Sequence, residues 1–578
     1  MRNANTNPLK LMLLVYCAFV TVHAAAQSTL YRQSSEVNDL MVHYEADEGS
    51  ITRFYYIESS PERRERMVKL TNEYLQQLKQ LKFESLPVGS KADYILFKRD
   101  LEDQVRTLDI EKKEYTGLAT WFPFAERIYE IERPRRRGTQ PDAQKLAAEM
   151  NALTAEIVKT TKLLGKETAI EEPLTRRGQS ITKGLQAALR SVNEFYTGYD
   201  PQFTWWTPEP YKKLDNALGE YLKVWDQKQK AAPAAKDDGS GIIGRPIGRD
   251  ELIRQLQFEL IPYTPEELID IANKEFAWCD AEMLKASNEM GFGNDWHKAL
   301  EKVKNTYVPA GKQPEAIMKL YNESVDFLKK NNLITIPPLA EETWRMIMMT
   351  PQRQLVNPFF TGGEVLSISY PTNTMDEDDK LMSMRGNNPH FSRATVHHEL
   401  IAGHHLQGFM NRRYKTYRNY RTPFWTEGWA LYWEMLLWDL KFPQSPEDRI
   451  GMLFWRMHRC ARIIFSLNYH LGKWTPQQCI DFLVDRVGHE RANAEGEVRR
   501  SFATNYGPLY QLAYMIGGLQ FYALKKELVD SGKMTYKQYH DAVMQENSMP
   551  VEMIRAILTN QPLSKDFKTN WRFYGKGF

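Results

Sequence analysis

Residues 397–405 read His-His-Glu-Leu-Ile-Ala-Gly-His-His and so place four histidines and one glutamate in nine positions. Clustered imidazoles pack poorly in a core, and an ordinary surface uses few of them. A polar helix end would also explain this composition, so a second observation has to decide. Residues 425–434, Trp-Thr-Glu-Gly-Trp-Ala-Leu-Tyr-Trp-Glu, place Glu427 inside a strongly apolar helical pattern. A carboxylate there needs a partner, and a metal ion is one.

A histidine followed directly by a glutamate on a helix is how zinc peptidases pair a metal ligand with a general base. His398 and Glu399 have this arrangement. The metal needs neutral imidazoles and a carboxylate, with one position left for water. The pattern departs from HExxH, because Ala402 stands four residues after His398 and the next histidine is His404.

The spacing of these histidines does not fit a regular helix. Residues six apart point about 120° away from each other and stand about 9 Å apart along the axis. We therefore predict that the helix is widened or broken at Ala402-Gly403, in the manner of a π-bulge, with Gly403 lowering the steric cost. His405 stays the alternative second ligand: it faces the right way but lies about 10.5 Å from His398 along the axis.

The whole chain has the composition of a folded enzyme. It has 578 residues, 42% of them hydrophobic, and its 76 Lys and Arg nearly balance its 73 Asp and Glu. This balance argues against disorder and against a nucleic-acid partner. Three of its four cysteines lie beyond the N-terminal segment, and we expect them to be buried thiols rather than a disulfide framework: Cys279, Cys460 and Cys479.

The N-terminus has the pattern of a secretory signal peptide, which we assign to residues 1–26. Arg2 and Lys10 are followed by an apolar run, and Ala24-Ala25-Ala26 offers a cleavage site. Lipid attachment at Cys17 is the alternative, but Tyr16 puts a bulky ring where a small residue is expected. We expect an exported protein, periplasmic or extracellular, with no membrane contact after cleavage.

The remaining chain divides at an Ala-, Pro- and Gly-containing linker over 231–241. We predict an N-terminal helical region, 27–240, and a catalytic helical region with the metal site, 241–578. Ser60-Pro61 and Thr264-Pro265 are typical of helix starts, and 362–370 is the best strand. The fold class is therefore mostly α, with a small β-sheet beside the zinc helix and a central cleft.

These motifs resemble those of the domain-of-unknown-function 885 family, placed near the gluzincin metallopeptidases. The family's HExxPGHHxQ resembles the segment from His398 to Gln407, and its EGWALYxE is matched from Glu427 to Glu434. A third and a fourth likeness lie in 462–474 and 514–517, and the resemblance spans roughly 245–560, more weakly before that. Several residues depart from the family's pattern, which puts substrate contacts in doubt: Ala402, Ser466, Asn468 and Tyr510.

The resemblance implies roles for individual residues. His398, His404 and Glu427 would bind one zinc ion, and Glu399 would be the general base. Tyr514 would stabilise the oxyanion or donate a proton, and His470 would orient the substrate. Each of these two could instead be structural, Tyr514 as a core ring and His470 as a helix cap. The metal could also be cobalt or manganese.

Other residues are candidates for supporting roles. Glu434 lies two turns after Glu427 on the same face, so it could hydrogen-bond a ligand histidine. Glu497 and Arg500 could form an ion pair. We expect one of three arginines to hold a substrate carboxylate: Arg385, Arg462 or Arg500. The strand 362–370 could bind a peptide by strand addition or be an ordinary hairpin strand.

The sequence thus predicts an exported zinc peptidase that hydrolyses short peptides by metal-activated water. The alternatives are a zinc-dependent hydrolase of a non-peptide amide or ester, a non-catalytic binding protein on the same fold, and a surface glycan-binding module. Exopeptidase and endopeptidase activity, and the oligomeric state, stay open.

Overall fold

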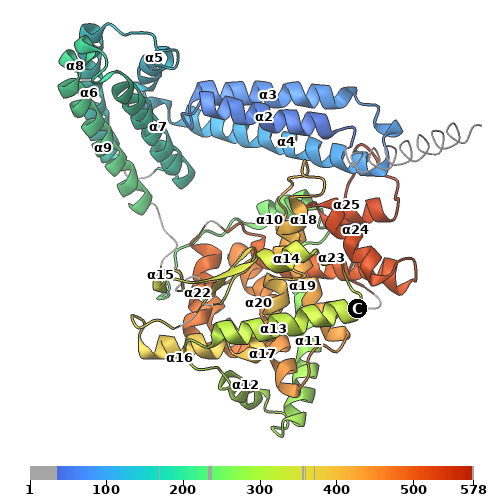
Figure 1. The fold of residues 1–578 in the computed structure, drawn as a ribbon. Coiled ribbons are helices and arrows are strands. Elements are labelled where there is room, and N and C mark those ends of the chain that lie inside the picture. The colour runs from blue at the N-terminus through green and yellow to red at the C-terminus, as the bar shows by residue number, and fades with distance from the viewer. Residues whose placement is uncertain are drawn as a thin grey trace, which may run out of the picture. The chain divides into compact units, whose positions relative to one another are not determined.

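The computed structural model describes residues 35–167, 170–231, 237–354, 357, 359–369, 371–504 and 506–575. The expected signal peptide lies outside them, as do residues 232–236 of the linker. The chain divides into two compact units (Figure 1). The N-terminal unit holds Val37–Ser85 and Tyr94–Lys236, and the C-terminal unit holds Asp237–Phe578, Leu86–Asp93 and the residues up to Glu36.

The described part of the N-terminal unit is built from helices. Ser60 caps α3 by accepting a hydrogen bond from the backbone of Arg63, with Pro61 in the first turn, as the sequence predicts. The core gathers large aromatic rings, among them Tyr221 and Trp225. The helices are α2 (Asn38–Phe54), α3 (Pro61–Gln80), α4 (Val88–Gly117, of which the part up to Asp93 belongs to the C-terminal unit), α5 (Ala125–Arg135), α6 (Ala143–Lys166), α7 (Glu172–Tyr196), α8 (Pro201–Trp206) and α9 (Pro208–Ala231), with 3₁₀ turns at Phe83–Ser85 and Ala119–Trp121.

The C-terminal unit is helical around one small sheet, which confirms the expected fold class. Its elements are α10 (Arg249–Phe258), α11 (Pro265–Glu289), α12 (Trp296–Lys304), α13 (Gln313–Lys330), α14 (Pro338–Thr343), β1 (Arg345–Met348), α15 (Pro351–Gln354), β2 (Val365–Ile368), α16 (Glu377–Gly386), α17 (Pro389–Glu399), α18 (His404–Asn411), α19 (Pro423–Asp439), α20 (Pro446–His470), α21 (Pro476–Val487), α22 (Arg491–Phe502), α23 (Tyr510–Lys525), a π-helical turn (Lys526–Asp530), α24 (Tyr536–Glu546) and α25 (Val551–Leu558).

Local sequence signals set where these helices begin. Thr264 forms the full capping box with Glu267 at the start of α11. The pair of a capping side chain and a following proline recurs at Asn388, Thr422 and Ser445, which open α17, α19 and α20. The helices that carry the candidate site therefore begin at positions that the sequence itself specifies.

The strand observed in the sheet is shorter than the strand predicted from the sequence. β1 and β2 pair in parallel, with Arg345 opposite Val365 and Met348 opposite Ile368. The chain before β2 turns back on it, because Thr361 and Ser367 exchange backbone hydrogen bonds. The predicted strand 362–370 is thus a four-residue strand with a folded-back arm, and Tyr370 lies outside the described residues.

Helices α19 and α23 approach unusually closely. A Cβ placed on Gly428 would lie 2.5 Å from the Cα of Gly517, so neither position has room for a side chain. On the rest of α19, Trp425, Trp429 and Trp433 are fully buried. This packing holds two segments that are distant in sequence at a fixed separation, and both carry candidate site residues.

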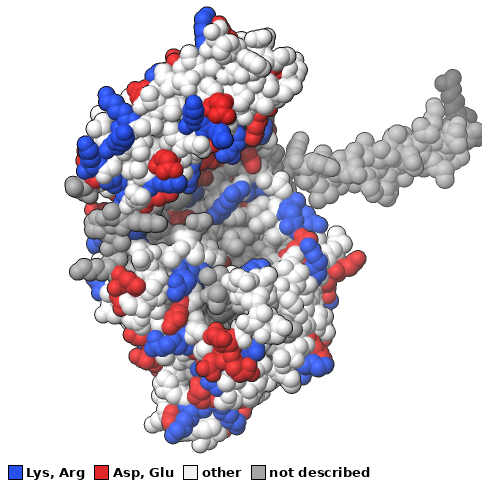
Figure 2. All heavy atoms as spheres, turned by 90° about the vertical axis from the view of Figure 1, so that its left-hand side faces the viewer, with Lys and Arg blue, Asp and Glu red and all other residues white. Residues whose placement is uncertain are grey.

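The cysteines and the surface match expectation. Cys279, Cys460 and Cys479 are buried free thiols. Lys and Arg alternate with Asp and Glu over the face drawn in Figure 2, in keeping with the small net charge. In the described part of the chain, no helix is long and apolar enough to cross a membrane.

Candidate metal centre

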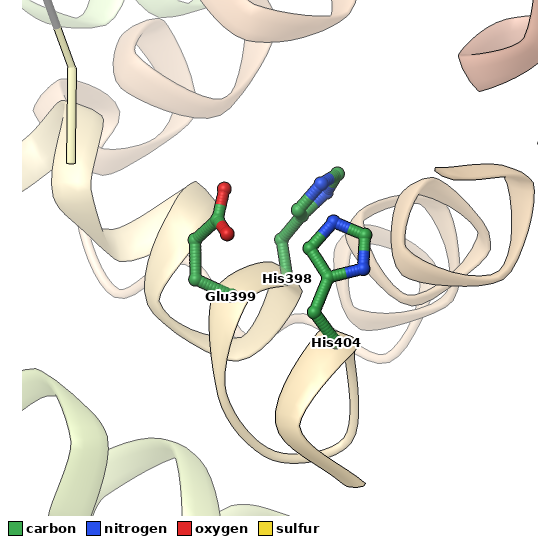
Figure 3. A group of neighbouring side chains, drawn as sticks. All are labelled: His398, Glu399 and His404. Atoms are coloured by element: carbon green, nitrogen blue, oxygen red, sulfur yellow. The ribbon is translucent and has the colours of Figure 1, made fainter. Parts of the chain in front are cut away.

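The helix that carries His398 is interrupted where the histidine spacing requires it. α17 ends at Glu399, α18 begins at His404, and Leu400–Gly403 form a turn between them. The break is a turn rather than a π-bulge. It brings the side chains of His398, Glu399 and His404 to the same side of the chain (Figure 3).

Backbone contacts hold this turn in place. The amide of Gly403 donates to the carbonyl of His397 at 2.9 Å, and the indole of Trp429 donates to the carbonyl of Ala402 at 2.9 Å. Gly403 has a φ of −89°, so its role is spatial rather than conformational. A Cβ there would overlap the carbonyl of His398. This agrees with the expectation that a glycine here lowers the steric cost of breaking the helix.

Three donor atoms converge beside this turn. The Nε2 of His398 lies 3.5 Å from Oε2 of Glu427, and the Nε2 of His404 lies 3.3 Å from the same oxygen. Ligands about 2.1 Å from a tetrahedral zinc stand about 3.4 Å apart. The Glu427 oxygen is buried and has no hydrogen-bond partner among the described residues. The three side chains therefore fit a metal ion of the zinc type.

The other nitrogen of each imidazole fixes the tautomer. The Nδ1 of His398 donates to Oε1 of Glu434 at 2.7 Å, and the Nδ1 of His404 donates to Oε1 of Gln407 at 3.1 Å. The amide nitrogen of Gln407 is bound in turn to the carbonyls of Trp425 and Thr426. With Nδ1 bound in this way, Nε2 is the nitrogen of each ring that faces a metal.

The electrostatics favour a cation at this point. Burial opposes charge on His404, but the neighbouring carboxylate of Glu427 outweighs it and raises the pKa of His404 to about 9. Burial also acts to raise the pKa of Glu427, but the two histidines prevail and hold it well below its usual range. Tyr510 donates its hydroxyl to Oε1 of Glu427 and leaves Oε2 for the centre.

The carboxylate of Glu399 stands next to the donor set. Ligand atoms of His398, Glu399 and His404 lie within 4.8 Å of one another. The backbone amide of Gly362 donates to Oε2 of Glu399 at 2.5 Å, and that of Gly363 donates to its carbonyl at 3.0 Å. The arm before β2 therefore fixes the orientation of Glu399 rather than leaving it to swing freely.

A cavity of about 300 Å³ opens onto these residues. Tyr514 stands in its wall, with its ring stacked on the ring of His398 at 6.1 Å between centroids. Burial raises the pKa of Tyr514, which keeps the hydroxyl protonated at neutral pH. The cavity is also lined by Arg353, Phe360, Thr395, Trp455, Arg459, Arg462, Arg500, Tyr506 and Tyr510.

Comparison with known proteins gives the family. A family model described as "Bacterial protein of unknown function (DUF885)" matches residues 56–558. The chain belongs to the DUF885 family. No curated protein matches it.

Two solved structures share the fold, each described as a "putative lipoprotein". The one from Shewanella oneidensis, of unknown function, is 16% identical, with a TM-score of 0.64 over 91% of this chain and 100% of its own. The one from Colwellia psychrerythraea is also 16% identical, with a TM-score of 0.56 over 91% of this chain and 98% of its own.

Most of the residues singled out from the sequence meet at this DUF885 site. Glu434 hydrogen-bonds His398, and Arg500 pairs with Glu497 at 2.8 Å. The cavity is lined by His398, Glu399, His404, Glu427, Arg462, Arg500 and Tyr514.

Three predicted residues lie elsewhere. The Nε2 of His405 donates to the carbonyl of Ala340 at 2.6 Å, since adjacent residues on a helix diverge. His470 packs on Tyr469 and Phe502, and burial lowers its pKa to about 4. Arg385 is bound to Glu301, Asn305 and Glu490.

Two further residues contact the candidate site although the sequence analysis did not assign them to it. Arg459 donates to Glu434 at 3.1 Å and lines the cavity. Arg459 and Arg462 stand one helical turn apart within the largely buried α20, and that spacing is a signal that could have found Arg459. Tyr510, noted in the sequence only as a departure, contacts the candidate ligand Glu427.

Proposed function

We propose that this chain is an exported zinc-dependent hydrolase that cleaves amide bonds of short peptides. One observation carries the proposal: His398, His404 and Glu427 direct three donor atoms at one point, beside the oriented carboxylate of Glu399. A metal-binding role alone does not need a base at that position. The combination is typical of hydrolytic zinc sites.

The residues at the site divide the chemistry between them. A zinc ion held by His398, His404 and Glu427 would act as a Lewis acid, lowering the pKa of a water and polarising a carbonyl. Glu399 accepts the proton of the attacking water and returns it to the leaving nitrogen. A carbon–oxygen bond forms, the carbon–nitrogen bond breaks, and one water is consumed. Tyr514 donates its hydroxyl to the charge that develops on the carbonyl oxygen.

The cavity supports a small substrate. Its volume of about 300 Å³ is at the lower end of the range for small-molecule sites. A folded protein domain could not place a peptide bond at its floor, whereas the end of a short peptide could. The aromatic and arginine side chains in the wall offer apolar contact and hydrogen-bond donors together.

Export rests on the N-terminal pattern. The apolar run and Ala24-Ala25-Ala26 are typical of a cleaved leader. The descriptions of both similar structures use the word lipoprotein, which is an exported class of protein. We place the mature protein in the periplasm or outside the cell.

A digest tests this function. Residues 27–578 are loaded with zinc and incubated with a mixed library of short peptides, and products are read by mass spectrometry. Glu399→Gln is run beside it, with Glu377→Gln, on the exposed start of α16, as the matched control. We expect cleavage by the wild type and the control and none by Glu399→Gln, with metal retained in all three. Cleavage by neither the wild type nor the control would overturn the peptidase proposal.

A further inference from the structure

Three arginines face the same cavity as the candidate metal centre, two of them buried and the third, Arg500, with 11% of its side chain exposed. Arg459 and Arg462 come from α20 and Arg500 from α22. Arg462 is 3% exposed and Arg459 is 4% exposed. Arginines this deeply buried require anionic partners, because an uncompensated guanidinium in a protein interior is strongly destabilising.

The protein pairs these three arginines with fewer than three carboxylates. Glu434 pairs with Arg459 at 3.1 Å but is also bound by His398. Glu497 is shared, since Arg462 donates to it at 2.7 Å and Arg500 at 2.8 Å. Glu399 and Glu427 also line this cavity but belong to the candidate metal centre, so the three guanidinium groups share two carboxylates and one positive charge beside the cavity has no carboxylate of its own.

The arginines also keep unused donors. Three buried nitrogens have no hydrogen-bond partner in the described chain: Nη1 of Arg462, Nε of Arg459 and Nε of Arg500. Arg385 offers a contrast, because its Nε, Nη1 and Nη2 bind Glu490, Asn305 and Glu301. Nε of Arg135 and Nε of Arg456 also lack a partner, so what distinguishes the three cavity arginines is that their side chains line the cavity beside the candidate metal centre.

Arg459, Arg462 and the candidate ligand His398 all pack against the ring of Tyr514. The Tyr514 ring stacks on His398 at 6.1 Å, and the guanidinium carbons of Arg462 and Arg459 lie 4.3 and 4.7 Å from the centroid of the same ring. An extended peptide advances about 3.3–3.6 Å per residue. A carboxylate held by these arginines therefore belongs to a residue close to the bond that is cleaved.

We propose that Arg459, Arg462 and Arg500 form a carboxylate subsite that binds the C-terminus of the peptide substrate. The chain is then a carboxypeptidase-type enzyme, an inference that rests on the proposed function. Hydrolysis adds one water across the bond, leaves a new carboxylate on the shortened peptide and releases a C-terminal fragment that keeps its original carboxylate. A planar guanidinium donates two parallel hydrogen bonds to such a group.

Binding to the inactive enzyme tests the subsite separately from catalysis. Zinc-loaded Glu399→Gln is titrated calorimetrically with one peptide in four forms: free acid, C-terminal amide, N-acetylated acid, and the amide with a glutamate at the last position. We expect the acid to bind about 10- to 100-fold more tightly than the amide. Acetylation of the N-terminus should change little, and the glutamate should not restore the binding that amidation removes.

Variants locate the subsite. In the Glu399→Gln background, Arg462→Gln should bring the acid and amide affinities together, and Arg500→Gln should do so in part. Arg491→Gln, on the same helix as Arg500 but 52% exposed at its side chain, is the control and should leave the ratio unchanged. The amide form is measured with every variant. A fold defect would therefore weaken the binding of both peptides, whereas loss of the subsite would weaken the binding of the free acid alone.

The outcomes separate the two proposals. Equal binding of acid and amide would overturn the subsite, as would recovery of binding by the side-chain glutamate. Cleavage of amidated and free peptides at equal rates by the wild type would also overturn it, while leaving the peptidase proposal intact. Selective binding of the acid without any cleavage by the wild type would support the subsite and remove the hydrolytic function.

Discussion

The Nδ1 of His398 lies 2.7 Å from Oε1 of Glu434, a carboxylate that is itself held by Arg459 at 3.1 Å. This pair fixes which nitrogen of His398 carries the proton and leaves Nε2 toward Glu427. Burial acts to raise the pKa of Glu434, but Arg459 and His398 outweigh it and lower the pKa. Glu434 is therefore an anion behind the ligand His398, and through that histidine it acts on any metal bound there.

Replacing Glu434 tests this coupling. Glu434→Gln keeps the shape of the side chain but removes its charge, so we expect zinc affinity to fall about 10- to 100-fold. Competition with a chromogenic chelator measures it. The exposed Glu377→Gln is the control. Unchanged affinity in Glu434→Gln would show that this contact does not orient the ligand.

The two tyrosines of α23 should differ in their effects. Tyr514→Phe removes a donor from the cavity wall, and we expect kcat to fall about 100-fold or more with zinc affinity retained. Tyr510→Phe removes the hydroxyl that Glu427 accepts, so it should weaken zinc binding instead. Steady-state kinetics and metal competition on both variants check this. The reverse pattern would exchange the roles of the two tyrosines.

The close contact between α19 and α23 predicts a stability effect. A Cβ on Gly428 would press on the backbone of Gly517 at 2.5 Å, so Gly428→Ala should cost about 1–3 kcal/mol or more. Gly408→Ala is the control in the same unit, because its nearest neighbour would be Arg412 at 3.8 Å. Thermal unfolding should show a lower midpoint for Gly428→Ala only. Equal midpoints for Gly428→Ala and the wild type would mean that α19 and α23 can move apart to accommodate a methyl group.

A buried histidine predicts how stability depends on pH. The Nδ1 of His540 donates to the carbonyl of Leu333 at 2.7 Å, and its Nε2 accepts from Tyr432 at 2.8 Å. Burial lowers the pKa of His540 to about 3. Between pH 6.5 and 3 the unfolded chain binds a proton that the folded chain does not, so the free energy of unfolding falls as the pH falls.

Substitution isolates this contribution. His540→Asn should be less stable at pH 7, but its free energy of unfolding should fall less steeply below pH 6.5, by up to about 1.4 kcal/mol per pH unit. Urea unfolding at several pH values measures the slope, with the exposed His43→Asn as control. An unchanged slope in His540→Asn would show that the ring is protonated in the folded protein.

Local and geometric features could be predicted from the sequence. Ser60 and Thr264 cap helices because capping depends on the next three residues alone. The break after Glu399 follows from the pitch of a helix and the spacing of His398 and His404. The mostly helical fold class and the DUF885 family were also predicted correctly.

Contacts between distant elements could not be predicted in this way. Gly362 reaches Glu399 across 37 residues, and Tyr510 reaches Glu427 across 83. Only the packing of the arm and of α23 creates these contacts. The sequence could have shown that His470 lies away from the site. It stands eight residues after Arg462 on one continuous helix, and eight residues span about 12 Å.

The most direct measurement is anomalous X-ray scattering at the zinc edge from a crystal of residues 27–578 grown with zinc. We predict one strong peak in the C-terminal unit, from a metal ion bonded to Nε2 of His398, Nε2 of His404 and Oε2 of Glu427, with Glu399 adjacent but not bonded. A crystal without a peak at these atoms, or with the metal bonded to Glu399 in place of Glu427, would contradict this prediction.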